Sequence, residues 1–440
     1  MVDLLNSILG SIVDIIFLTW WVILPVVLVF VFWDVWMVYI RTRFIKEKLS
    51  WVLLEIKVPK EVLKTPKAME QIFTGVYSSY SYGLSFVGKY WEGEVEPWFS
   101  FEIVGFDGAA HFLVRTLKDY RNLIESAVYA QYPDAEINEI EDYFNLLPKE
   151  LPNKDYDLWG TEMVLGRDSV YPLRTYFYFE ESVEEQRIDP VAAIIEVMAG
   201  LKEGEMVIIQ VMISPTGGAT GNDWKEEAES VINKIMGRKV VEKKPSAIAG
   251  YFYAVGEFFH NLVLAVWRFP VWSGGEGGEE KEKVIFETKT PGETDIMKAV
   301  ENKISKLGFN GFLRFVYVDR RDSFTGLNVS AIMGAFHQFN TQNMNFLKPN
   351  KTITVYGKLP GKIFPFYKKI MLNYKKRRLF RRCRERRFGD YNLVRDEKFS
   401  VFNTEELSTI YHFPIKGVES PSLRRVEAKK GEPPSTLPKK

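Results

Sequence analysis

An uncharged apolar run near the start of the chain constrains the fold more than any other feature. It extends from Ile15 to Trp33, nineteen residues with Pro25 near the centre and no charged side chain. A helix of that length covers about 30 Å, which is the thickness of the hydrocarbon core of a bilayer. The sequence therefore predicts one N-terminal transmembrane helix at about 15–37, within an N-terminal segment 1–45.

The charges beside this run predict its orientation. Asp3 and Asp14 precede it, and four cations follow it closely: Arg41, Arg43, Lys46 and Lys48. An acidic start and a long apolar run do not fit a cleaved signal peptide. We therefore expect a single-pass protein of the cell membrane. Positively charged segments beside a span stay on the cytoplasmic side, which sets its orientation. Its N-terminus would lie outside, its soluble domains in the cytoplasm, and the lipid bilayer would be its first partner.

Residues 46–150 show the alternation of a small α+β domain. Strand and helix patterns follow one another as strand 51–58, a helix from Pro66, strands 99–104 and 111–115, helix 118–131 and strand 136–143. This βαββαβ order is that of a ferredoxin-like domain. The first soluble domain is predicted to have that fold.

Residues 151–345 predict a second ferredoxin-like domain of the α+β class. Met206–Ile213 is almost entirely apolar, which indicates a central buried strand, and 173–179 also has a strand pattern. An insertion at 238–283 interrupts the domain with an apolar helix at 247–269. That helix would lie on the bilayer surface or pack on the domains, and the sequence leaves both open. A second membrane span is the third alternative, against which its charges and Gly250 and Gly256 argue.

The remaining residues predict a basic helical region, 346–416, and a flexible tail, 417–440. Within the region 346–416, Thr404 is expected to cap a short helix whose first turn is acidic. The tail is rich in Pro, Lys and Glu, which is typical of an unpacked terminus.

The basic region contains the most unusual stretch of the chain, Lys368–Arg387. It holds eleven Lys and Arg and one acid, a charge of +10, in a chain whose net charge is +1. Three roles remain open: binding nucleic-acid phosphate, docking on anionic lipid, or forming a solvated helix that makes salt bridges to the acidic remainder of the chain. The candidate contacts to DNA or lipid are Lys375, Lys376, Arg377, Arg378, Arg381, Arg382, Arg384, Arg386 and Arg387.

No motif in the sequence carries enzyme chemistry. Cys383 is the single cysteine, and the four histidines are scattered without metal-binding spacing. The string starting at Gly357 resembles a phosphate-binding loop but lacks a Ser or Thr after Lys362. The glycine-rich loop 217–221 is either an anion cradle or a flexible loop. We expect no enzyme activity, no cofactor and no metal.

Six sequence segments together carry a resemblance to known proteins, and they occur here in the same order: 53–73, 125–143, 171–180, 189–198, 402–414 and 429–438. They resemble a membrane-anchored family of unknown function from small-genome bacteria. Similar segments precede the motor domain in ATPases of the type IV secretion coupling and HerA/FtsK-like class. The resemblance implies that this chain corresponds to the anchor and scaffold part of such an ATPase, without the motor domain.

Two functional hypotheses follow. The first is a membrane-anchored, non-enzymatic scaffold, an accessory subunit of a type IV secretion or DNA-translocation apparatus. Its partner would be a separately encoded ATPase, and homo-oligomers are plausible in such assemblies. The alternative is a membrane-tethered nucleic-acid-binding protein that holds DNA through the basic helix 368–387.

Overall fold

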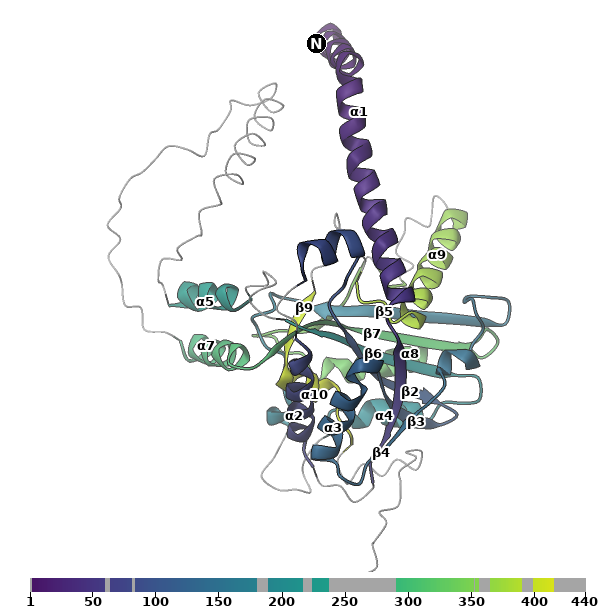
Figure 1. Cartoon of the computed structure of the whole chain (residues 1–440), viewed down its shortest axis with the longest axis vertical. Helices are drawn as coiled ribbons and strands as arrows, with labels where there is room; N and C mark the ends of the chain where they lie inside the picture. The colour runs from purple at the N-terminus through teal and green to yellow at the C-terminus, as the bar shows by residue number, and fades with distance from the viewer. Residues whose placement is uncertain are drawn as a thin grey trace, which may run out of the picture.

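The computed structural model is built around one large sheet, from which a long N-terminal helix projects (Figure 1). The structure describes residues 2–59, 64–80, 84–179, 189–216, 224–236, 290–351, 353–355, 365–389 and 399–414. The predicted insertion helix 247–269, the glycine-rich loop 217–221 and the tail 417–440 lie outside these residues.

Within the described residues, the sheet has nine strands, and every pairing among them is antiparallel. Eight of them lie in the order β4-β1-β3-β2-β6-β7-β5-β8, and β9 also pairs with β7. The bounds are β1 Trp51–Lys57, β2 Phe99–Phe106, β3 Ala109–Leu117, β4 Glu136–Glu139, β5 Tyr156–Leu165, β6 Met206–Pro215, β7 Gly308–Arg320, β8 Leu347–Pro349 and β9 Ser400–Asn403.

The prediction of two ferredoxin-like domains is therefore wrong. Strands β2 and β6, which would be edge strands of separate sheets, pair over eight residue pairs from Phe99↔Ile213 to Phe106↔Met206. Both strands carry apolar side chains toward both faces and are almost completely buried. An edge of that kind is stable only when another strand covers it, and here each covers the other.

The two halves of the sheet repeat one strand order. Numbered from its own first strand, each half reads 4-1-3-2: β4-β1-β3-β2 in the first and β8-β5-β7-β6 in the second. Helices also occupy matching places, since α2 (Pro66–Val76) and α4 (Ala192–Ala199) each follow a first strand. Likewise α3 (Arg121–Gln131) and α8 (Gly326–His337) each follow a third strand. The halves meet at β2 and β6.

Helices cover the two faces of this sheet unequally. α2, α3, α4, α8 and α10 (Thr404–Ile410) pack on one face through a large apolar cluster that includes Phe73, Ile195, Phe336 and Ile410. α9 (Pro365–Arg384) packs on the other face with Leu379, Phe380 and Cys383, beside the segment that follows β4. Two further helices, α5 (Trp224–Ile235) and α7 (Pro291–Ile304), pack against each other.

Helix α1 (Val2–Glu47) contains the apolar run that predicts a transmembrane helix. Within the described residues, no helix combines the length and apolar character that crossing a membrane requires. The predicted span is therefore wrong, and so are the single-pass cell-membrane location and the orientation derived from it. The helix continues past the run and packs on the protein: Met37 and Ile40 are buried, beside the short η2 helix (Gly88–Glu92).

Most other elements lie where the sequence predicts them, with some local differences. The strand predicted at 136–143 ends at Glu139, and Tyr143 begins a short 3-10 helix. Residues 173–179 do not form a strand but contain a short 3-10 helix, η5 (Tyr176–Tyr178). Helix α10 is capped by Asn403 rather than Thr404, because Asn403 and Glu406 form a reciprocal capping box.

Candidate interaction site on helix α9

The basic residues predicted as a binding site do not share one surface. Lys376, Arg382 and Arg386 are buried, whereas Arg377 and Arg381 are exposed. The other four are partly exposed: Lys375, Arg378, Arg384 and Arg387. A third of the predicted site, three residues of nine, thus turns toward the sheet, and the contacts of these three explain why.

A row of polar side chains crosses the sheet under α9. Glu102 of β2 pairs in register with Gln210 of β6, Gln210 with Arg314 of β7, and Arg314 with Glu162 of β5. All four are buried within strands that are otherwise mostly apolar. We call these four residues the polar row. Buried charges need partners, and α9 and its C-terminal turn supply them.

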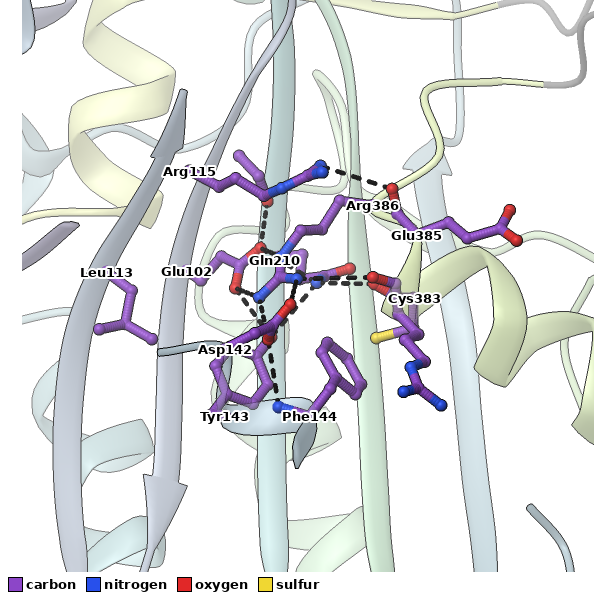
Figure 2. A network of polar contacts seen from close by, with 12 residues as sticks. Glu102, Leu113, Arg115, Asp142, Tyr143, Phe144, Gln210, Cys383, Glu385 and Arg386 are labelled. Atoms are coloured by element: carbon purple, nitrogen blue, oxygen red, sulfur yellow. Dashed lines mark hydrogen bonds and ion pairs between the residues drawn. The ribbon is translucent and has the colours of Figure 1, made fainter. Parts of the chain in front are cut away.

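Arg386 joins the polar row at Glu102 (Figure 2). Its Nε donates to Glu102 Oε1 at 2.8 Å, and its Nη1 donates to Asp142 Oδ2 at 2.5 Å. The hydroxyl of Tyr143 donates to the second oxygen of Glu102 at 2.8 Å, and Ser100 donates to the first at 2.6 Å. One guanidinium is thereby held between two carboxylates.

At the other end of the polar row, two guanidiniums share one carboxylate. Arg314 donates to Glu162 Oε1 through Nε at 3.1 Å and Nη2 at 2.7 Å. Arg382 of α9 lies 3.2 Å from the same oxygen. Arg314 also reaches Gln210 Oε1 at 2.9 Å, which connects the two ends.

The same side chains hold the C-terminal end of α9 by its carbonyl groups. Every backbone carbonyl from Arg382 to Arg387 accepts a side-chain hydrogen bond. In chain order the donors are Arg314, Gln210, Arg386, Arg115, Trp98 and again Arg314. The last carbonyls of a helix lack partners within the helix, and cations at this end also complement its dipole. The sheet therefore fixes where α9 ends.

The turn that closes α9 has an unusual residue at its key position. Arg387 N bonds to Arg382 O at 3.0 Å and Arg386 N to Cys383 O at 3.1 Å, the pattern of a Schellman motif. Arg386 has φ 45°, a conformation that favours glycine. An arginine occupies it because its side chain is needed for Glu102 and Asp142.

The pKa values of three groups beside the end of α9 are shifted by this packing. Burial acts to raise the pKa of Asp142, but hydrogen bonding and attraction from Arg386 outweigh it, so the pKa lies below its usual value. Burial, with a smaller contribution from nearby Arg386, lowers the pKa of Arg115 to about 10. Burial raises the pKa of the Cys383 thiol to about 12, so this cysteine is not a reactive thiolate.

The outward side of α9 carries a different set of residues. Ile370, Tyr374, Arg377 and Arg381 recur at spacings of four, three and four, which places them along one side of the helix. All four are exposed, Ile370 at 52% and Tyr374 at 61%. We call them the exposed stripe.

Two of the described histidines each contact one carboxylate. His111 contacts Glu55 at 2.7 Å, and His412 lies between Asp189 and the carbonyl of Ser408. Among the described residues, no group of three or more His, Cys, Asp or Glu side chains is placed to hold a metal ion.

Sequence reasoning missed the polar row and a buried Lys303–Glu406 ion pair, whose atoms lie 2.9 Å apart. A signal was present for the polar row. Glu102, Gln210 and Arg314 each interrupt an apolar strand sequence. A charge in such a position predicts a buried partner, although it does not say which one.

A family model matches most of the chain. A family model described as a domain of unknown function (DUF8128) matches residues 41–425. That range includes the sheet, its covering helices and the polar row. The search of curated proteins found no match.

Proposed function

The chain belongs to the DUF8128 family, and we propose that it is a non-enzymatic scaffold that binds an acidic protein partner through the exposed stripe of α9. The observation that carries the proposal is the contrast between the two sides of this helix. One side is fixed to the sheet through Arg382, Arg386 and four backbone carbonyls that accept hydrogen bonds from strand side chains. The other side presents Ile370, Tyr374, Arg377 and Arg381.

The composition of the exposed stripe suits a protein interface. Tyr and Arg are enriched among the residues that dominate binding energy, and an aliphatic neighbour such as Ile370 adds apolar contact. A helix held firmly at one end loses little freedom on binding, which favours affinity. Arg377 and Arg381 together favour a partner whose surface is acidic at the contact.

The resemblance of the sequence to the region before a secretion or DNA-translocation motor supports a more specific partner. We propose a separately encoded motor ATPase that presents an acidic patch to α9. The scaffold would then supply position, and the partner would supply ATP hydrolysis.

The first test measures binding of the full chain to a fluorescein-labelled glutamate-rich peptide at about 150 mM salt, where only close charge pairs persist. Arg377→Gln with Arg381→Gln should weaken binding about tenfold. The matched control, Lys225→Gln with Lys298→Gln, removes two exposed cations from α5 and α7 and should change little. Equal losses in both variants would contradict the proposal.

Duplex DNA in the same assay tests the alternative. Nucleic-acid binding through α9 would fall steeply with salt and would exceed peptide binding at every salt concentration. That result would replace the protein partner by DNA.

A photo-crosslinking residue at Tyr374 then tests for the partner in cells. The expected product is one crosslinked protein whose yield falls with Arg377→Gln and Arg381→Gln. A crosslink that persists unchanged in that variant would mean that the exposed stripe does not select its partner by charge.

A further inference from the structure

A cavity opens where β7 changes its neighbour. β5 pairs with β7 as far as Met163↔Leu313, and β9 takes the same side of β7 from Gly311↔Ser400 onward. Two side-chain bonds bridge the gap: Leu165 N to Ser400 Oγ at 3.0 Å and Val401 N to Ser169 Oγ at 3.1 Å. The space between the diverging strands has a volume of about 420 Å³, within the range of small-molecule sites. We call it the fork cavity.

One wall of the fork cavity is aromatic. Phe312 and Phe399 line it, with their rings within 16° of parallel and their centres 6.2 Å apart. Phe388 extends the stack, at 4.7 Å from Phe399 and 5.7 Å from Phe312. Parallel rings of this kind favour contact with another planar ring.

The charged lining consists of two cations, Arg167 and Lys348, and two carboxylates, Glu162 and Asp168. Arg167 donates to the backbone carbonyls of Gln342 and Asn343, both at 2.8 Å, and Lys348 to that of Gly166 at 3.0 Å. Carbonyl acceptors hold these side chains in place but do not neutralise their charge. Glu162 lines the cavity too, and its carboxylate is already shared by Arg314 and Arg382.

The loop that carries Arg167 is fixed in advance. The side-chain oxygen of buried Asn345 accepts from Gly166 N at 3.1 Å and Arg167 N at 3.0 Å, and its amide donates to Asp168 O at 3.1 Å. A Cβ at position 166 would lie 2.3 Å from the ring of Phe346, so a larger residue here would displace that ring. The lining is therefore held by backbone and buried contacts.

We propose that the fork cavity binds a small anion that carries a planar ring. The ring lies against Phe312 and Phe399, and the anionic group meets Lys348 and Arg167. Asp168, the carboxylate on this rim, limits the affinity by repulsion. This site is separate from the exposed stripe and does not depend on the proposed protein partner.

Adenosine monophosphate is a suitable probe because it joins a planar ring to an anion. Calorimetry with the full chain should show binding at least about tenfold tighter than adenosine alone or inorganic phosphate alone. Lys348→Gln should weaken it about fivefold, and Asp168→Asn should tighten it about threefold. Both side chains are exposed, so neither change should alter the thermal unfolding midpoint.

Variants at Arg377 and Arg381 separate this site from α9, and they should leave adenosine monophosphate binding unchanged. Binding that fails in those variants but survives Lys348→Gln would overturn the proposal. Absence of binding at about 5 mM probe, or equal affinity for phosphate alone, would overturn it as well.

Discussion

The face of the sheet under α2, α3, α4, α8 and α10 is packed by apolar side chains, whereas the face under α9 places four polar side chains in one row. The apolar face gains stability from area removed from water, a force without direction. The polar face depends on particular partners, because a buried charge that loses its partner is costly. The α9 face also buries an apolar cluster around Leu379 and Phe380, but only this face depends on particular charge pairs, and these pairs fix the position and the end of one helix.

The largest effect should follow from removing the guanidinium that joins α9 to Glu102. Arg386→Ala leaves Glu102 and Asp142 without their cation, and we expect a loss of about 3–5 kcal/mol in the free energy of unfolding. Denaturant titration measures it. Arg386→Gly separates backbone from side chain: it should recover about 1 kcal/mol of that loss, because φ is positive there. A loss below about 1 kcal/mol for Arg386→Ala would show that the polar face does not depend on its pairs.

Removing an apolar side chain from the apolar face should lower the free energy of unfolding somewhat less than Arg386→Ala, and it should not loosen α9. Ile209 lies in β6 next to Gln210 but faces the other side of the sheet. Ile209→Ala should cost about 2–4 kcal/mol, from lost transfer energy and the cavity left behind. Below the unfolding transition, it should leave Cys383 as protected from thiol reagents as in the parent protein. Early exposure of Cys383 would mean that the two faces are coupled.

A smaller change should loosen α9 alone. Lys376 pairs with Asp157 at 2.5 Å in a partly buried position. We expect Lys376→Ala to lower stability by about 1 kcal/mol and to speed labelling of Cys383 by Ellman's reagent about fivefold through local opening. The exposed change Arg377→Ala is the control, and similar labelling rates in the two variants would argue against local opening.

The smallest expected effect is a change in how the stability of the fold depends on pH. The hydrogen bond from His111 lowers the pKa of Glu55, burial opposes it, and Lys57 adds to the lowering. A carboxylate with a lowered pKa stabilises the fold above its ordinary value of about 4.5, and that stability is lost as pH falls through the folded value. Glu55→Gln should therefore flatten the acid limb of the stability–pH curve below about pH 4.5. An unchanged limb would assign the loss of stability to other carboxylates, such as Asp142.

Local structure was largely predictable, because periodicity depends on neighbours in the chain. The pattern of Met206–Ile213 predicts a buried central strand, and β6 is one. Residues 173–179 alternate like a strand but form only a 3-10 turn. Tertiary contacts take up their backbone groups: the side chains of Glu406 and Thr409 accept from Leu173 N and Tyr176 N.

Long-range pairing was not predictable from the same patterns. Nothing in the sequence says that the edge strand of one half meets the edge strand of the other, so the halves were predicted as separate domains. The basic run was predicted as one charged surface for a similar reason. Arg386 lies 284 residues from Glu102 along the chain, and only the fold shows that these two are partners.

The position of Glu102 also matters while the chain is being made. Strand β2 ends at Phe106 and β6 begins at Met206, so the ribosome completes β2 long before its neighbour. During that interval β2 is an open edge, the kind of surface on which nascent chains aggregate. An ionised carboxylate at its centre discourages pairing with another copy, because burying it there would leave it without a cation. Its cation, Arg386, is added only late in synthesis. Until then Glu102 protects the unfinished sheet, and afterwards the same carboxylate holds the end of α9 through Arg386.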